Sequence, residues 1–137
     1  MMHQAGSMAE AVDKAAAAVT RPDASGRRLI EDKSVAYRLG RSVARLEAAL
    51  SAPNIFGRVA IAQTMRDISP DLMDLLGAAS ALPFGTEGAA DDGSAEYVYR
   101  FAPLVGIYGG TLEVFRNMIG QYALGLGKPN YSPPKAS

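Results

Sequence analysis

Apolar residues recur at spacings of three and four in three segments of the chain, which is typical of helices with one buried face. The first series is Ala36, Leu39, Val43, Leu46 and Leu50. The second series is Ile61, Met65, Ile68, Leu72 and Leu75. The third series is Leu112, Phe115, Ile119 and Tyr122. The pattern predicts three amphipathic helices, and the first of them runs from Arg27 to Ser51.

Prolines and glycines place the boundaries of these helices. Pro53 and Asn54 end the first one. Pro70 lies inside the second series, and because the apolar spacing continues in phase across it, we expect a kink rather than an end. Two glycines and Pro129 follow the third series and predict its C-terminus.

Two further helices are expected outside the periodic segments. Ser7-Met8-Ala9-Glu10 fits a capping box and predicts a helix from Ser7 to about Thr20, after a disordered N-terminus at 1–7. Segment 77–94 has no periodicity and is interpreted as a mobile surface loop, before a short helix at about 95–104. Residues 130–137 are expected to form a disordered tail. With no strand-like alternation, the sequence predicts an all-α, antiparallel up-and-down bundle of four to five helices.

Net charge, cysteine content and the length of apolar runs argue against several classes of function. Fourteen basic and fourteen acidic side chains cancel, so no global field would attract nucleic acid or an anionic membrane. The absence of cysteine excludes disulfides and thiolate chemistry and fits a reducing compartment, so we expect a cytoplasmic protein. No apolar run is long enough to predict a membrane span.

Few side chains suggest metal or acid–base chemistry. His3 is the single histidine and lies near the terminus, so no metal site is predicted. Asp91 and Asp92 are adjacent carboxylates in the predicted loop, where such pairs usually serve solubility rather than catalysis. We therefore predict no catalytic pair and no metal there.

Arginines form a stripe on the helix predicted at 27–51. Arg38, Arg41 and Arg45 are placed opposite the apolar face, and Arg27 and Arg28 stand at the helix start. A solvated face is one interpretation. Contact with a phosphate-bearing ligand or an acidic partner is the other, since a guanidinium matches phosphate geometry. The spacing leaves both open.

The stretch Tyr108-Gly109-Gly110-Thr111 precedes the last helix. Consecutive glycines permit positive φ and a close backbone approach, and Thr111 is a favourable N-cap. The free amides of a helix start can bind an anion. The same residues also serve as a plain connection between helices, and both interpretations remain open.

The closing motif resembles that of the flavin-dependent acyl-CoA dehydrogenases, commonly IYGGTxEIQRNxIAxxxLGL. The matching residues are Ile107-Tyr108-Gly109-Gly110-Thr111, Glu113-Val114, Arg116-Asn117-Met118-Ile119 and Leu124-Gly125-Leu126. Weaker likenesses are Arg100-Phe101, Asp74-Leu75-Leu76-Gly77 and Arg28. The resemblance covers residues 8–129, as the C-terminal helical domain of that family.

This resemblance implies a role beside a flavin. In the family, FAD takes a hydride from the β-carbon of an acyl-CoA while a glutamate removes the α-proton. The residues implied to contact FAD or the acyl thioester are Tyr108, Gly109, Gly110, Thr111 and Glu113. Glu113 falls where many members have a glutamine that touches the FAD of a neighbouring subunit. As a carboxylate it could accept from a ribose hydroxyl but would repel a pyrophosphate.

The chain also departs from the family. Gly109 stands where many members carry the catalytic glutamate, so no catalytic residue is predicted. The Gln-x-x-Gly-Gly-x-Gly site for FAD is replaced by residues 74–80, which keep one glycine of three. The N-terminal helical domain and the β-domain of the family have no counterpart in these 137 residues.

Three hypotheses follow. The chain is the C-terminal region of an acyl-CoA dehydrogenase that is inactive alone. Alternatively, it is a non-catalytic helical subunit that self-associates or docks on a full-length flavoprotein homologue and completes its FAD site. The third reading is an unrelated small helical bundle.

Overall fold

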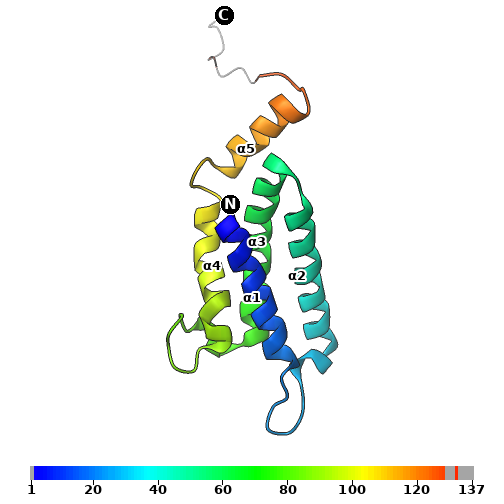
Figure 1. Ribbon diagram of the computed structural model, residues 1–137, viewed down its shortest axis with the longest axis vertical. Helices are drawn as coiled ribbons and strands as arrows, with labels where there is room; N and C mark the ends of the chain where they lie inside the picture. Colours follow the sequence, from blue (N-terminus) through cyan, green and yellow to red (C-terminus); the bar gives the residue numbers. More distant parts are fainter. Residues whose placement is uncertain (1, 129–131, 133–137) are drawn as a thin grey trace, which may run out of the picture.

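The described part of the chain folds into five α-helices joined by loops and short helical turns (Figure 1). The computed structural model describes residues 2–128 and 132. The main helices are α1 (Met2–Thr20), α2 (Lys33–Ser51), α3 (Asn54–Leu76), α4 (Ser94–Val105) and α5 (Leu112–Met118). The shorter segments are the 3-10 helices η1 (Leu29–Glu31), η2 (Ala78–Ala81) and η3 (Ala90–Gly93), and the π-helix η4 (Ile119–Ala123). Apart from Ser132, the tail predicted at 130–137 lies outside the described residues.

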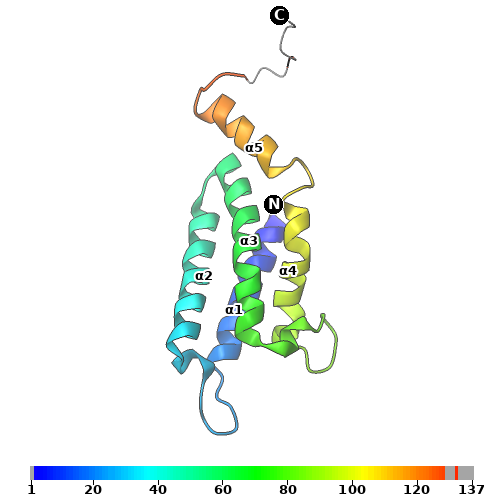
Figure 2. The same ribbon diagram turned by 180° about the vertical axis from the view of Figure 1, so that it is seen from behind.

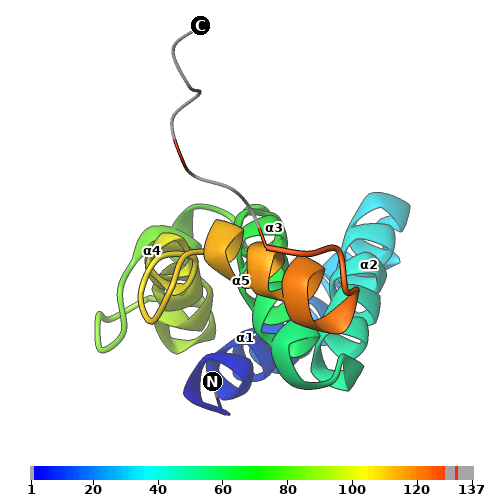
Figure 3. The same cartoon turned by 90° about the horizontal axis from the view of Figure 1, so that it is seen from above.

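Helices α1 to α4 run alternately down and up, and α5 lies across one end of the bundle (Figures 1 and 2). Viewed from above, α5 crosses the end of α3 (Figure 3), and these two helices are in contact. No strand occurs in the described ranges. The predicted all-α, antiparallel bundle is therefore confirmed.

The core lies mainly between α1, α3 and α4. Met8, Met65, Leu72 and Val98 are fully buried in it, with small alanines of α1 such as Ala15 between them. Small side chains let helices approach closely, and dense packing of this kind makes the interior intolerant of added volume. None of the described helices is long and apolar enough to span a membrane.

Helix α1 begins at Met2, so the predicted start at Ser7 is wrong, and residues 2–7, predicted to be disordered, are helical. The Ser7 hydroxyl does not cap a helix but donates to the carbonyl oxygen of His3, 3.0 Å away. A serine inside a helix commonly bonds back to the preceding turn in this way. The capping-box pattern alone could not distinguish these two uses.

Helix α2 begins at Lys33, later than predicted. The carboxylate of Asp32 caps it by accepting from the amides of Ser34 and Val35, at 2.7 and 3.4 Å. Arg28, before the helix, has an extended backbone. An aspartate N-cap satisfies helix-start amides and so fixes the boundary six residues after Arg27.

The buried face of α2 also differs from the predicted one. Its buried residues are Leu39, Ser42, Leu46 and Ala49. Val43 and Leu50 are instead exposed. The predicted series and the buried series both have helical spacing and share Leu39 and Leu46. The buried face is turned toward Ser42 and Ala49 instead of Val43 and Leu50.

Helix α3 continues through Pro70, as the unbroken apolar phase predicted. It contacts α1, α2 and α4. Because it has neighbours on several sides, its buried positions include polar Thr64 and Ser69 beside its apolar series.

The segment 77–94 is more structured than the predicted loop. It contains η2 and η3, and Ser80 is buried, with its hydroxyl donating to the carbonyls of Met73 and Gly77 at 2.9 and 2.6 Å. Gly93 is buried as well. Hydrogen bonds and burial therefore fasten this segment to the end of the bundle.

Candidate functional site

The connection between α4 and α5 is a tight turn built on two glycines. After α4, the amides of Ile107 and Tyr108 both donate to the carbonyl of Leu104, at 3.0 and 3.1 Å. Gly109 and Gly110 follow with φ of 69° and 117°, values that residues with a side chain rarely adopt. The paired glycines are thus required by the backbone path.

Thr111 is the N-cap of α5, as predicted. Its backbone is extended, and its hydroxyl oxygen accepts from the amide of Val114 at 3.3 Å. The amide of Phe115 donates to the carbonyl of Thr111 at 3.1 Å, and that of Leu112 donates to the carbonyl of Gly106, also at 3.1 Å. The bonds from Leu112 and Val114 use amides that a helix start normally leaves free, and the bond from Phe115 is the first one within the helix.

Replacing Thr111 with alanine should therefore weaken the start of α5. We expect Thr111→Ala to lower the free energy of unfolding by about 1 kcal/mol, and Thr111→Ser to change it little because the hydroxyl remains. Urea unfolding followed by far-UV circular dichroism measures both. Equal stabilities of the two variants would contradict the capping role.

Glu113 is an acidic residue in the first turn of α5. Its pKa is lowered, first by a hydrogen bond from its own backbone amide, then by the Thr111 hydroxyl, and further by the cations Arg116 and Arg66. A carboxylate in the first turn of a helix also interacts favourably with the helix dipole. Glu113 therefore acts as an internal anion at the beginning of α5.

Arg58 of α3 holds the turn from behind. Its Nη2 donates to the carbonyl of Val105 at 2.6 Å and to that of Tyr108 at 3.0 Å. The guanidinium carbon lies 5.7 Å from the centre of the Tyr108 ring and 4.9 Å from that of Phe115, within cation–π range. One cation thus joins the end of α4, the turn and α5, although nothing in the sequence pattern singled it out.

The Phe115 ring also lies close to Gly110. A Cβ added at Gly110 would meet the Phe115 ring at 3.2 Å, tighter than ordinary contact, whereas one at Gly109 would meet nothing within 4 Å. The Tyr108 ring lies 6.2 Å from that of Phe101 on α4. The turn is packed on one side and open at Gly109.

Two arginines of the α2 stripe pair with carboxylates of α3. Arg38 Nη2 contacts carboxylate oxygens of Asp71 and Asp74 at 2.6 and 3.0 Å, and Arg45 Nη2 contacts Asp67 at 2.7 Å. All three carboxylates are on α3. The prediction that these two arginines lie opposite the packed face is wrong, because they bridge α2 to α3. Arg41 is exposed.

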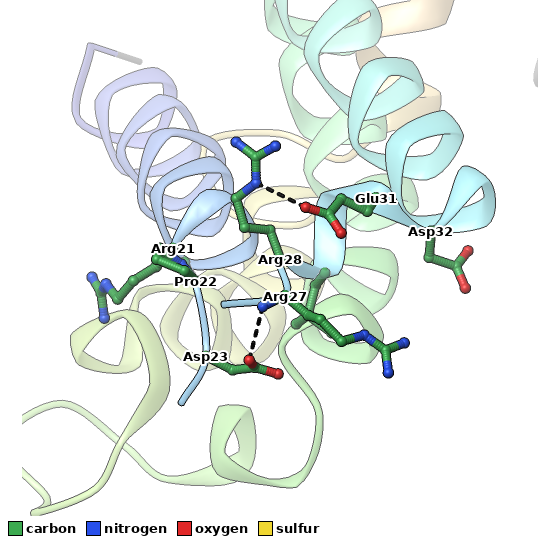
Figure 4. A pocket seen from close by; sticks show the side chains of 9 residues that line it. Arg21, Pro22, Asp23, Arg27, Arg28, Glu31 and Asp32 are labelled. Atoms are coloured by element: carbon green, nitrogen blue, oxygen red, sulfur yellow. Dashed lines mark hydrogen bonds and ion pairs between the residues drawn. The ribbon is translucent and has the colours of Figure 1, made fainter. Parts of the chain in front are cut away.

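A pocket with a volume of about 620 Å³ lies between the end of α1 and η1 (Figure 4). Arg28 pairs with Glu31 at 3.1 Å, and the side chains of Arg21 and Arg27 point to opposite sides. The amide of Arg27 donates to the carboxylate of Asp23. Since the guanidinium groups diverge, the pocket is not arranged as a clamp for one phosphate.

The remaining sequence candidates have structural roles. Asp91 accepts from the amide of Ala95 at 2.9 Å and so supports the start of α4, and burial raises the pKa of Asp91. Asp92 lies 3.6 Å from the ammonium of Lys14. His3 is on the exposed side of α1. No cluster of metal-ligating side chains occurs within the residues described.

Known proteins match both the bundle and the turn. The family model for the acyl-CoA dehydrogenase C-terminal domain matches residues 1–59 and 56–124. Acyl-CoA dehydrogenase FadE26 of Mycobacterium tuberculosis (strain ATCC 25618 / H37Rv) is 31% identical over 131 residues, covering 79% of this chain and 32% of that protein.

Solved structures show the same architecture. The ChsE4-ChsE5 complex from Mycobacterium tuberculosis superposes with a TM-score of 0.78 at 27% identity, over 92% of this chain and 36% of that one. The structure described as the Tcur3481-Tcur3483 steroid ACAD gives a TM-score of 0.76 at 23% identity, over 91% of this chain and 35% of that one. At that identity the second likeness shows the fold alone.

The bundle with its glycine turn is thus an acyl-CoA dehydrogenase C-terminal domain in architecture. The chain belongs to the acyl-CoA dehydrogenase family. It spans about a third of the length of the relatives it matches.

Proposed function

We propose that the chain is the C-terminal helical region of an acyl-CoA dehydrogenase and that it forms one wall beside the FAD and the acyl thioester. The family match over nearly all of the described chain supports this assignment. The observation that supports the position beside the ligands is the turn between α4 and α5. A Cβ at Gly109 would meet no atom within 4 Å, while Arg58 holds the neighbouring carbonyl of Tyr108 in place. Tyr108, Gly109, Gly110, Thr111 and Glu113 remain the residues proposed to face the ligands.

The same turn argues against catalysis by this chain alone. Removing an α-proton needs a base with a pKa near the working pH, positioned beside the substrate. Gly109 has no side chain, and Glu113 has a lowered pKa and is bonded to its own helix start. A carboxylate stabilised in this way is a poor base. We propose that the base comes from another part of the assembled protein.

The purified chain should therefore show no dehydrogenase activity. Mixed with FAD, acyl-CoA substrates of several chain lengths and a redox dye, it is expected to form no 2-enoyl-CoA above the rate without protein. A full-length flavin-containing family member serves as the positive control. Formation of 2-enoyl-CoA by the 137-residue chain would refute the proposed inactivity.

A second candidate is a non-catalytic subunit that docks on a flavin-containing homologue. Apolar side chains around α5 support it: Ile107, Val114, Met118 and Tyr122 are 38% to 79% exposed. Exposed apolar patches of this kind commonly mark interaction surfaces. The structural relative at 27% identity was itself solved as a complex.

Size-exclusion chromatography with light scattering tests this candidate. Mixed with a full-length homologue from the same genome, the chain should co-elute with flavin absorbance, and Val114→Glu should prevent it. Tyr37→Glu, on the exposed face of α2, is the matched control. Co-elution that survives Val114→Glu would exclude the α5 surface. A cytoplasmic location and a role in fatty acid metabolism are part of the same proposal.

A further inference from the structure

The acyl-CoA dehydrogenase resemblance implies FAD contacts at two places in this chain, the start of α5 and the end of α3. Each place can be tested by the donors and charges it offers to a pyrophosphate, which needs amides or cations that are not already bonded.

At the start of α5, the amide donors of the first turn are used within the chain. Those of Leu112, Val114 and Phe115 donate to Gly106 or Thr111 at 3.1 to 3.3 Å. The Glu113 carboxylate stands at the same turn, and its pKa is lowered first by its own backbone amide. A phosphate at this first turn would meet the negative charge of Glu113, and the amides of Leu112, Val114 and Phe115 already have partners.

The packing behind the turn keeps this arrangement in place. Leu112 is buried, and Phe115 lies between the glycine backbone and the guanidinium of Arg58. Releasing the helix amides toward a ligand would require these contacts to separate. The first turn of α5 is therefore held in place by contacts within the chain.

The end of α3 shows the same property. Asp74 carries a carboxylate where family members have glutamine, and it pairs with Arg38 at 3.0 Å. The amides of Gly77 and Ser80 donate to carbonyls of the same segment, and the Ser80 hydroxyl also donates inward. The two places, at different ends of the bundle, thus each carry a carboxylate and amides that already have partners within the chain.

We infer that this chain does not hold the phosphates of FAD, because Glu113 and Asp74 place negative charge at both places and amides beside them already have partners within the chain. This inference rests on the proposed function. It adds that, in an assembled flavoprotein, the FAD phosphates are bound by residues outside these 137, while the turn at Gly109 contributes shape beside the ring or the acyl group.

The test uses the full chain labelled with ¹⁵N. Titration with inorganic pyrophosphate is expected to leave the amide signals of residues 77–80 and 112–115 without saturable shifts, and FAD should shift them no more than riboflavin does. Saturable shifts with pyrophosphate, or a clear preference for FAD over riboflavin at these amides, would overturn the inference.

A variant tests the part assigned to Glu113. Glu113→Gln restores the glutamine common in the family and should raise hydrogen exchange of the first-turn amides of α5 several-fold. Glu47→Gln, an exposed carboxylate on α2, is the matched control and should leave it unchanged. Unchanged hydrogen exchange in Glu113→Gln would show that the Glu113 carboxylate does not protect the first-turn amides of α5.

These outcomes are separable from the proposed function. A chain that binds pyrophosphate overturns the inference but still belongs beside a flavin. A chain that rejects pyrophosphate and never assembles with a flavoprotein upholds the inference and removes the docking candidate.

Discussion

Replacing Arg58 with methionine is expected to release the Tyr108–Thr111 turn and to lower the free energy of unfolding by about 2–4 kcal/mol. The guanidinium donates to the carbonyls of Val105 and Tyr108, and both would lose a charged donor. Its cation–π contacts with Tyr108 and Phe115 would be lost as well. Urea unfolding gives the stability, and hydrogen exchange over residues 105–118 reports the release of the turn.

Two companion variants distinguish the specific contacts of Arg58 from a general effect of removing a positive charge. Arg41→Met removes an exposed arginine of α2 and should leave stability within about 0.5 kcal/mol of the original. Arg58→Lys keeps the positive charge and one donor group but loses the planar, forked guanidinium. The stability of Arg58→Lys should therefore fall between that of the original protein and that of Arg58→Met. If Arg58→Met has the same free energy of unfolding as Arg41→Met and its amides at 105–118 exchange no faster, the contacts of Arg58 do not stabilise the turn.

Local signals in the sequence predicted the parts of this fold that depend on local physics. Apolar spacing carried α3 through Pro70, and the preference of threonine for helix starts placed the cap of α5 at Thr111. Both depend on residues within one or two turns of each other. A pattern of neighbours in sequence is sufficient for such features.

Features that depend on distant partners were missed or wrong. Arg58 acts on carbonyls 47 and 50 positions later, which no spacing rule indicates. In α2, Val43 and Leu50 were predicted on the buried face, but Ser42 and Ala49 are buried instead. Arg38 of this helix pairs with Asp71 of α3. Helix orientation is a property of the pair of helices.

The candidate site shows the same division. The closing motif identified the turn and the family, because that motif is local and long. The sequence also showed that Glu113 is acidic, but not that its carboxylate meets its own amide and the Thr111 hydroxyl. That contact decides whether the helix start remains available to a ligand.

Gly93→Ala should be among the most damaging single changes in the chain, with an expected loss of about 3–5 kcal/mol of unfolding free energy. Gly93 is buried at the start of α4, with φ of 77°, which disfavours any side chain. A Cβ there would also lie 2.7 Å from the carbonyl carbon of Pro83 and 2.8 Å from the Cα of Phe84, both backbone atoms that cannot rotate away. Thermal or urea unfolding measures the loss.

Gly88→Ala is the control that separates backbone strain from collision. Gly88 has φ of 82°, nearly the same as Gly93, but a Cβ there would meet no atom within 4 Å. It should therefore cost only about 1–2 kcal/mol, the price of the left-handed backbone. The excess for Gly93→Ala measures how tightly the segment 77–94 packs against α4, and hence how firmly the helix leading to the Tyr108–Thr111 turn is anchored. Equal losses in the two variants would show that this segment yields to the added methyl group and does not anchor α4.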